Sequence, residues 1–197
     1  MILVLGIAAG WLAGYARSQI RGTPYHVPEL SQLWLVPLAV LPQLLVFQIP
    51  ATSDLFSDRV AAIILVASQL VLLVFIWLNR GRTGILILGC GLLLNLLVIT
   101  HNSGLMPISP ETASSLYPEV PIAVWQVYTR PGWSKNILLS PENTRLAWLS
   151  DTILLPTWFP WTRALSPGDL LIVLGAFWLL TLESSRPAAP SLRKSEI

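Results

Sequence analysis

The chain of 197 residues is more apolar and less charged than an ordinary soluble domain. Hydrophobic residues make up 54% of it and charged residues 11%, whereas a typical globular domain is about half apolar and about a quarter charged. The small formal charge of +2, without a basic run rich in aromatics, argues against nucleic acid as a partner, and the lone Cys90 excludes an internal disulfide and a CxxC motif. We therefore expect a membrane protein whose main partner is the lipid bilayer.

Five apolar segments predict transmembrane helices, so the expected fold class is an all-α membrane protein. The segments cover residues 2–16, 33–49, 60–78, 84–100 and 166–182. Basic residues gather in alternate connections, at Arg17, Arg21, Arg80, Arg82, Arg186, Arg193 and Lys194. Because cytoplasmic loops are enriched in Lys and Arg, we expect the N-terminus outside and the C-terminus in the cytoplasm.

This topology divides the chain into four parts. Residues 1–100 hold the first four helices, and residues 101–165 form a Trp-rich extracytoplasmic cap. Residues 166–182 form the fifth helix, and residues 183–197, rich in Pro, Ser and basic residues, form a flexible cytoplasmic tail.

The first apolar segment carries a small-residue face. Gly6, Gly10 and Gly14 recur at every fourth position, and this spacing lets two helices approach closely in a membrane. The pattern predicts helix packing, either within the chain or with another subunit.

Three amide side chains lie at a similar predicted depth in the second, third and fourth segments. Gln43, Gln69 and Asn95 are candidates for hydrogen bonds between helices or for a ligand site at the midplane. Pro37 and Pro42 remove backbone donors from the second segment and predict a bent helix beside Gln43.

The cap is expected to contain short interfacial helices. Ser-Pro-Glu at residues 109–111 and 140–142 and Ser-Pro-Gly-Asp at 166–169 are helix-start signals. Residues 140–154 show helical spacing, and residues 120–128 fit either a strand or another interfacial helix. Trp at positions 125, 133, 148, 158 and 161 indicates a cap that lies against the membrane or docks a partner.

Several cap motifs resemble those of a family of small bacterial multi-pass membrane proteins of unknown function. The motifs are Asn-x-Gly-x-Met-Pro at residues 102–107, Leu-x-Asp at 149–151 and Ser-x-Gly-Asp at 166–169. The resemblance implies a bacterial plasma (inner) membrane protein and no known activity. Its outer-face residues are Asn102, Gly104, Met106, Pro107, Asp151, Gly168 and Asp169.

Most of these motif residues have a structural interpretation. Asn102 can bond the carbonyls at a helix end, Gly104 can adopt a positive φ, and Asp169 completes a capping box begun by Ser166. An alternative brings His101, Asn102, Asp151 and Asp169 together as an acid/base or hard-cation site.

Three functional hypotheses follow. The first is a non-catalytic accessory or scaffolding subunit of a larger bacterial membrane complex, for example a respiratory or photosynthetic one. The second is a small transporter or a protein that binds lipid, quinone or pigment, although no inverted repeat supports transport. The third is an interfacial enzyme that uses Asp151 and Asp169. No cofactor and no metal site is predicted.

Overall fold

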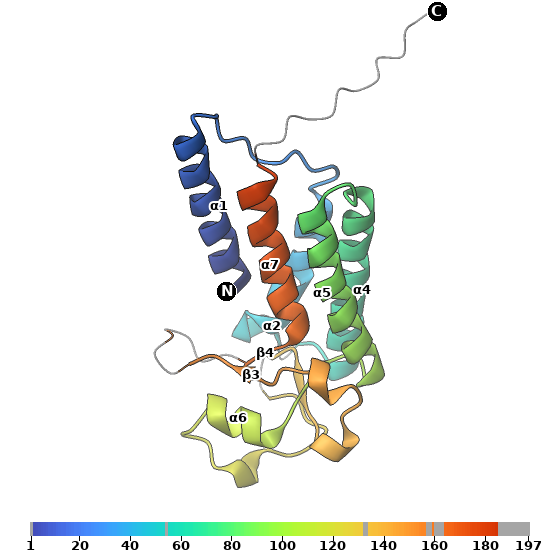
Figure 1. The fold of residues 1–197 in the computed structure, drawn as a ribbon. Coiled ribbons are helices and arrows are strands. Elements are labelled where there is room, and N and C mark those ends of the chain that lie inside the picture. Colours follow the sequence, from blue (N-terminus) through green and yellow to red (C-terminus); the bar gives the residue numbers. More distant parts are fainter. Residues whose placement is uncertain (1, 54, 132–133, 157–158, 160–163, 185–197) are drawn as a thin grey trace, which may run out of the picture.

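The protein is a bundle of helices with an irregular cap at one end (Figure 1). The computed structural model describes residues 2–53, 55–131, 134–156, 159 and 164–184. The helices of the bundle are α1 (Ile2–Arg21), α2 (Leu35–Phe47), α4 (Asp58–Leu78), α5 (Thr83–His101) and α7 (Pro167–Leu182), with a short α3 (Pro50–Ser53). The predicted flexible tail lies outside the described residues from position 185 onward.

The cap holds short elements between α5 and α7. They are β1 (Met106–Ile108), α6 (Pro110–Leu116), η1 (Ile122–Val124), β2 (Asn136–Leu138), η2 (Pro141–Asn143), η3 (Ala147–Leu149), β3 (Ile153–Leu154) and β4 (Ala164–Leu165). β1 pairs with β2 in parallel, and β3 pairs with β4 antiparallel.

A helix forms within each of the five predicted apolar segments, and the fold is mostly helical. Among the described residues, α4 and α5 are long and apolar enough to cross a membrane, while α2 and α7 are apolar but shorter. α1 extends to Arg21, five residues beyond the predicted end. α2 starts at Leu35, so Pro37 lies in its first turn, where its missing N–H would have no helical partner, and only Pro42 lies inside the helix.

The all-α prediction did not include the paired strands β1–β2 and β3–β4 of the cap, and the cap differs from the sequence prediction in two further segments. Residues 140–154, predicted as one helix, instead form the two 3-10 turns η2 and η3 followed by β3. The prediction was wrong because Leu146 has a φ of 54° and a ψ of 43°, which no right-handed helix can contain. Residues 120–128 form neither predicted element but the 3-10 turn η1 and irregular chain.

The glycine face of α1 packs on α7, inside the chain. A Cβ added to Gly6 would lie 2.6 Å from Val173 Cγ1, and one added to Gly10 would lie 2.9 Å from Phe177 Cα. At Gly14 the nearest atom would be the Leu180 carbonyl oxygen at 2.3 Å. These contacts are closer than any side chain permits, so the three glycines set the distance between α1 and α7.

A second set of glycines brings α5 and α7 together. Gly84 and Gly91 on α5 are seven residues apart, as are Gly168 and Gly175 on α7. A Cβ on Gly91 would lie 2.4 Å from the Gly168 carbonyl oxygen, and one on Gly175 would lie 2.6 Å from the Gly84 carbonyl oxygen. α7 therefore lies between α1 and α5 with a glycine contact on each side (Figure 1).

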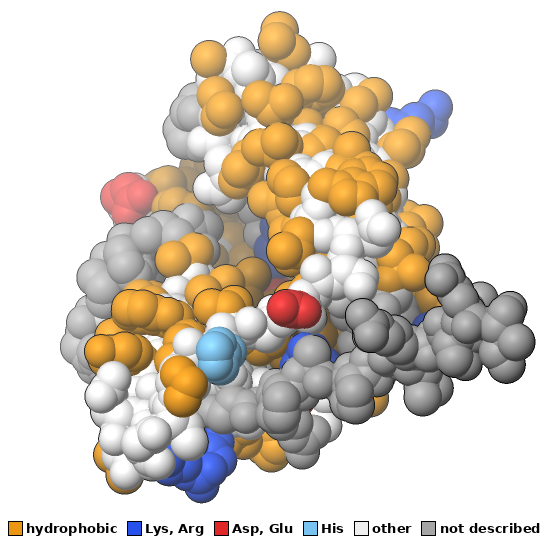
Figure 2. Space-filling view, turned by 90° about the horizontal axis from the view of Figure 1, so that it is seen from above, with side chains coloured by type: hydrophobic (Ala, Val, Ile, Leu, Met, Phe, Trp, Pro, Cys, Tyr) orange, Lys and Arg blue, Asp and Glu red, His pale blue; other side chains and the backbone are white. Residues whose placement is uncertain are grey.

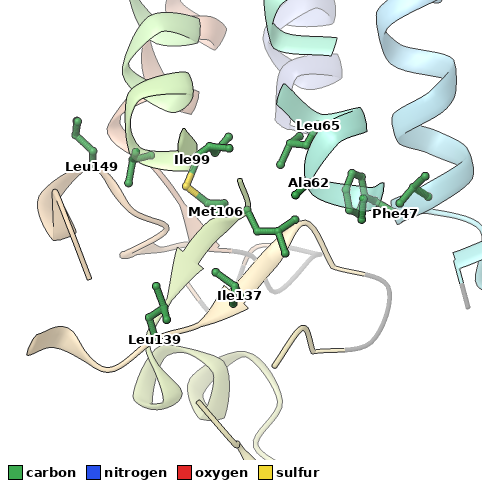
Figure 3. Packing of buried hydrophobic residues seen from close by; sticks show 12 residues of the cluster. Phe47, Ala62, Leu65, Ile99, Met106, Ile137, Leu139 and Leu149 are labelled. Carbon is green, nitrogen blue, oxygen red and sulfur yellow. The ribbon is translucent and has the colours of Figure 1, made fainter. Parts of the chain in front are cut away.

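The cap shares one hydrophobic core with the bundle. Met106 and Leu105 are almost fully buried and pack with Leu65, Ile99 and Leu149. Figure 3 shows Leu65 and Ile99 near the helix ends in one cluster with Met106 of β1 and Ile137 of β2. Since its strands are too short to be stable alone, the cap depends on this shared core.

The outer surface of the bundle is largely apolar. In the view onto one end of the molecule, hydrophobic side chains far exceed charged ones (Figure 2). Exposed large hydrophobic residues occur on every long helix, for example Leu12, Leu38, Ile63, Leu93 and Leu174. A surface of this kind is typical of helices that contact lipid or other apolar partners.

Candidate functional site

The site starts at the first turn of α7, where it meets α5. Ser166 caps α7: its Oγ accepts a hydrogen bond from Asp169 N at 3.0 Å, and Asp169 Oδ2 accepts one from Ser166 N at 3.2 Å. This is the predicted capping box, and the structure confirms it.

Asn95 of α5 completes this first turn from the neighbouring helix. It donates from Nδ2 to Asp169 Oδ1 at 2.9 Å, and its Oδ1 accepts from Ser166 Oγ at 2.8 Å. Gly168 makes this possible, because a Cβ there would lie 2.1 Å from Asn95 Oδ1.

Lys135 joins the two carboxylates of the site. Its Nζ lies 3.5 Å from Asp151 Oδ2 and 3.6 Å from Asp169 Oδ2. The lysine side chain is 36% exposed, whereas those of Asp151 and Asp169 are 3% and 19% exposed. Burial lowers the pKa of Lys135, but the two carboxylates outweigh that effect and raise the pKa above its usual value. The ammonium group is therefore charged at neutral pH.

Asp151 is held by the β1–β2 pair. The pairing places Asn136 beside Met106, and Asn136 Nδ2 donates to Asp151 Oδ2 at 2.8 Å. The other carboxylate oxygen, Oδ1, is buried without a hydrogen-bond partner among the described residues. Burial raises the pKa of Asp151, and the opposing effects of Lys135 and Asn136 offset only part of this shift. Lys135 is thus the main charge that offsets the buried carboxylate.

Asn102 ties the end of α5 to the middle of the cap. Its Nδ2 donates to Val98 O and to Arg145 O, both at 2.8 Å, and its Oδ1 accepts from Arg145 N at 2.9 Å. Gly104 follows with a φ of +81°. The predicted roles of Asn102 and Gly104 at the helix end are confirmed, and Asn102 has the additional role of a bridge to Arg145.

Replacing Asn102 with Asp is expected to loosen the cap. The substitution removes both Nδ2 donors and places a carboxylate beside the carbonyl oxygens of Val98 and Arg145, so we expect a loss of about 2 kcal/mol. The carboxylate of Asp can still accept from Arg145 N, so the amide to follow is that of Leu149, which bonds Leu146 O in the neighbouring turn η3. Its hydrogen exchange should accelerate more than exchange in the middle of α4. His101→Gln is the control, because the exposed His101 ring makes one side-chain hydrogen bond among the described residues, to Leu97 O of its own helix at 2.8 Å. Equal exchange in N102D and wild type would contradict the bridging role.

A third polar contact joins the cap to the start of α4. Arg130 Nε lies 3.0 Å from Asp58 Oδ1, and its Nη2 donates to Phe56 O at 3.3 Å. The cap is therefore fastened to α4 by Arg130, to α5 by Asn102 and to α7 by Lys135.

The comparison with protein families gives one match. A model of a family of unknown function, DUF5317, matches residues 28–181. The chain belongs to DUF5317. No curated protein and no solved structure matches it. The matched region contains the whole cap and all residues of the polar site, but the glycine face of α1 precedes it.

The DUF5317 chain brings together only some of the residues singled out in the sequence. Asp151 and Asp169 meet at Lys135, while Met106 and Pro107 are buried in β1. His101 and Asn102 make no hydrogen bond to either carboxylate within the described part of the chain. Asn95 turns to Asp169 and Ser166. It does not bond Gln43 or Gln69, and Gln69 Oε1 is buried without a partner among the described residues.

Lys135 and Asn136 are the site residues that sequence reasoning missed in this DUF5317 protein. Lys135 is one of two lysines in a chain whose other basic residues are arginines. That difference was the available signal, because Lys and Arg are not interchangeable where a compact charge is needed.

The arrangement of these side chains in this DUF5317 chain is better suited to holding the cap on the helix bundle than to acid/base catalysis or metal binding. Every oxygen of Asp169 and one oxygen of Asp151 is bonded within the site. Within the described ranges, no group of three or more His, Cys, Asp or Glu side chains could hold a metal ion. The site instead places one ammonium between two carboxylates at the point where cap and bundle meet.

Proposed function

We propose that the protein is a multi-pass protein of a bacterial plasma membrane, with all five long helices in the bilayer and the cap on the extracytoplasmic side. The apolar outer surface of the helices supports this. So does the position of Arg17, Arg21, Arg80 and Arg82, which lie at or just beyond the ends of α1, α4 and α5 that are remote from the cap. Exposed Trp34 and Trp77 lie near the same ends, as expected at a membrane interface.

Within that membrane the protein acts as a non-catalytic accessory or scaffolding subunit of a larger complex. The observation that carries this proposal is a set of exposed apolar residues between the end of α6 and β2, called the cap strip here: Tyr117, Ile122, Val124, Val127 and Tyr128, each 42–61% exposed. η1, in the middle of this cap strip, contacts α6, which lies in Figure 1 at the end of the cap away from the helix bundle. A bilayer around the helices would not cover it, so a protein partner is the suitable occupant.

Two contacts hold the ends of the cap strip in place. The rings of Tyr117 and Trp125 pack at 5.9 Å, and Tyr128 N donates to Leu138 O of β2 at 2.7 Å. Preorganised aromatic surfaces lose little conformational entropy on binding.

Mild extraction tests the proposal. The tagged protein, 21.7 kDa as a chain, is extracted in digitonin from its own membrane after cross-linking, and its particle mass is measured. Wild type is expected in a particle that contains a second, defined membrane protein. The double variant I122E/V124E is expected to lose that partner, because two charges replace the apolar centre of the cap strip.

The matched control adds the same charge elsewhere on the cap. Ser115 and Asn143 are exposed and lie outside the cap strip, so S115E/N143E is expected to keep the partner. A strictly monomeric wild type, or a partner retained equally by both double variants, contradicts the proposal.

The enzyme alternative has one observation in its favour, since Asp151 and Asp169 do approach each other. The hydrogen bonds described above nevertheless occupy most of their oxygens, and Asp151 is 2% exposed. A buried carboxylate that holds the fold is poorly placed to reach a substrate. A structural role in holding the cap on the bundle therefore explains Asp151 and Asp169 better than a catalytic role does.

A further inference from the structure

Two carboxylates share one ammonium where the cap meets α7, and this leaves a buried excess of negative charge. Lys135 Nζ lies 3.5 Å from Asp151 Oδ2 and 3.6 Å from Asp169 Oδ2. When all three groups are ionised, the cluster therefore carries one net negative charge. Removing a net charge from water is unfavourable, and one of two neighbouring carboxylates commonly takes up a proton instead.

Asp151 is the member of the cluster that lacks a further positive group. Its side chain is 3% exposed, and its Oδ1 is buried without a hydrogen-bond partner among the described residues. Asp169 differs, because its two oxygens accept hydrogen bonds from Asn95 and Ser166. A buried polar atom without a partner is rare in native structures, so Asp151 Oδ1 indicates a ligand that is small and positive.

The elements around Asp151 supply no other charge for this oxygen. Asp151 follows η3, which packs on α5 and α7, and β1, β2 and η3 contain no charged residue. His101 at the end of α5 and Arg145 before η3 are exposed. In the described part of the chain, neither makes an ion pair or a side-chain hydrogen bond with Asp151. A proton is the ligand that fits, because it needs no shell of ligating atoms.

We propose that Asp151 is a proton-binding site through which the cap responds to pH. A proton from the solvent adds to Oδ1, while Oδ2 keeps the hydrogen bond from Asn136 Nδ2 at 2.8 Å. Lys135 then pairs with Asp169 alone, and the cluster becomes neutral. The partly exposed side chain of Lys135 connects the cluster to solvent. The proposed membrane setting decides only which compartment's pH is sensed, and the proton site rests neither on that setting nor on the proposed partner.

The cap is expected to be held more tightly in mild acid than at neutral pH. Burial raises the pKa of Asp151 in the folded protein above its ordinary value of 3.8. Between these two pKa values the folded chain binds a proton that the unfolded chain does not bind, so stability falls as the pH rises through the folded-state pKa.

Thermal unfolding of D151N measures this dependence, because the amide that replaces the carboxyl cannot titrate. The unfolding midpoint of D151N minus that of wild type should grow as the pH is raised from near 3.8, the ordinary pKa of Asp, to neutral. Changes in the other titrating groups affect both proteins and cancel in the difference. Equal pH profiles of D151N and wild type overturn the proposal.

Infrared spectroscopy of the full chain in detergent detects the proton itself. A protonated carboxyl has a carbonyl stretch that is separate from the carboxylate and amide bands. Wild type should show such a band at a pH at which ordinary carboxyls are ionised, and D151N should lack it. E142Q is the matched control, because Glu142 is an exposed carboxyl of the same cap, and this variant should keep the band. Folded wild type without the band, or the same band in D151N, overturns the proposal.

A second variant tests the assignment without removing the carboxyl. N136L removes the N–H that favours the charged form of Asp151. The pKa of Asp151 should therefore rise, and the infrared band should persist to a higher pH than in wild type. A band that titrates at the same or a lower pH in N136L overturns the assignment to Asp151.

The salt of the buffer distinguishes a proton from a sodium ion at Asp151 Oδ1. The infrared titration is repeated in sodium chloride and in choline chloride at equal ionic strength. A proton site should give the same titration in both salts. A band that sodium suppresses shows that the oxygen binds a metal ion, and this result overturns the proposal.

Discussion

Replacing Lys135 with Met is expected to destabilise the protein by about 3 kcal/mol, because it leaves the buried carboxylate of Asp151 without its counter-charge. The side chain of Asp151 is 3% exposed, and one of its oxygens already lacks a hydrogen-bond partner among the described residues. In a protein of this size such a loss lowers the midpoint of thermal unfolding by about 6–12 °C. Thermal unfolding in detergent measures it.

The double variant K135M/D151N separates lost charge pairing from lost packing. Asn has nearly the shape of Asp but carries no charge, so the double variant should be more stable than K135M alone. A D151N substitution that stabilises K135M, although it removes a bonded carboxylate in the wild type, shows that the two residues interact. If D151N lowers the stability of K135M further, the ammonium is not the counter-charge of Asp151.

Replacing Gly168 with Ala is expected to force α5 and α7 apart. The new Cβ would lie 2.1 Å from Asn95 Oδ1 and 2.7 Å from the Gly91 carbonyl oxygen. The second contact is with backbone, which cannot rotate away, so the cost should reach the upper end of the usual range for overpacking, about 3 kcal/mol. The bond from Asn95 to Asp169 should be lost at the same time, which nuclear magnetic resonance of the Asn95 side-chain amide can detect.

Gly81 provides the matched control for this variant. A Cβ at Gly81 would meet no atom within 4 Å, so G81A should change the unfolding midpoint little. Similar effects of G168A and G81A would show that the two helices tolerate separation and that Gly168 does not set their distance.

The sequence was most informative where local chemistry decides the structure. Apolar runs placed the five long helices, Ser-Pro-Glu and Ser-Pro-Gly-Asp placed the starts of α6 and α7, and Gly104 was identified as a residue that needs a positive φ. Each depends on a few neighbouring residues. The prediction for residues 140–154 failed because helical spacing was present, but the left-handed backbone of Leu146 is imposed by the surrounding cap.

The site formed by Lys135, Asp151 and Asp169 could be predicted only in part. Asp151 and Asp169 were noticed as motif residues, yet their counter-ion is Lys135, which lies in a segment without periodic pattern. Gly168 was noticed as a motif residue, but the packing role of the glycines of α5 and α7 was missed, because their spacing of seven residues becomes meaningful only once the two helices are known to be neighbours. Contacts between distant segments leave little trace in one sequence.

The central position of α7 has a consequence for the order in which the protein is made. Synthesis runs from the N-terminus, so the glycine face of α1 exists long before the helix that covers it, and Arg17 bonds Thr181, 164 residues later. Lys135 is likewise made before Asp169, the second of the two carboxylates that it contacts. During synthesis, α1 therefore lacks its partner helix and Lys135 lacks one of its two carboxylates until α7 is made, and the formation of α7 completes both contacts.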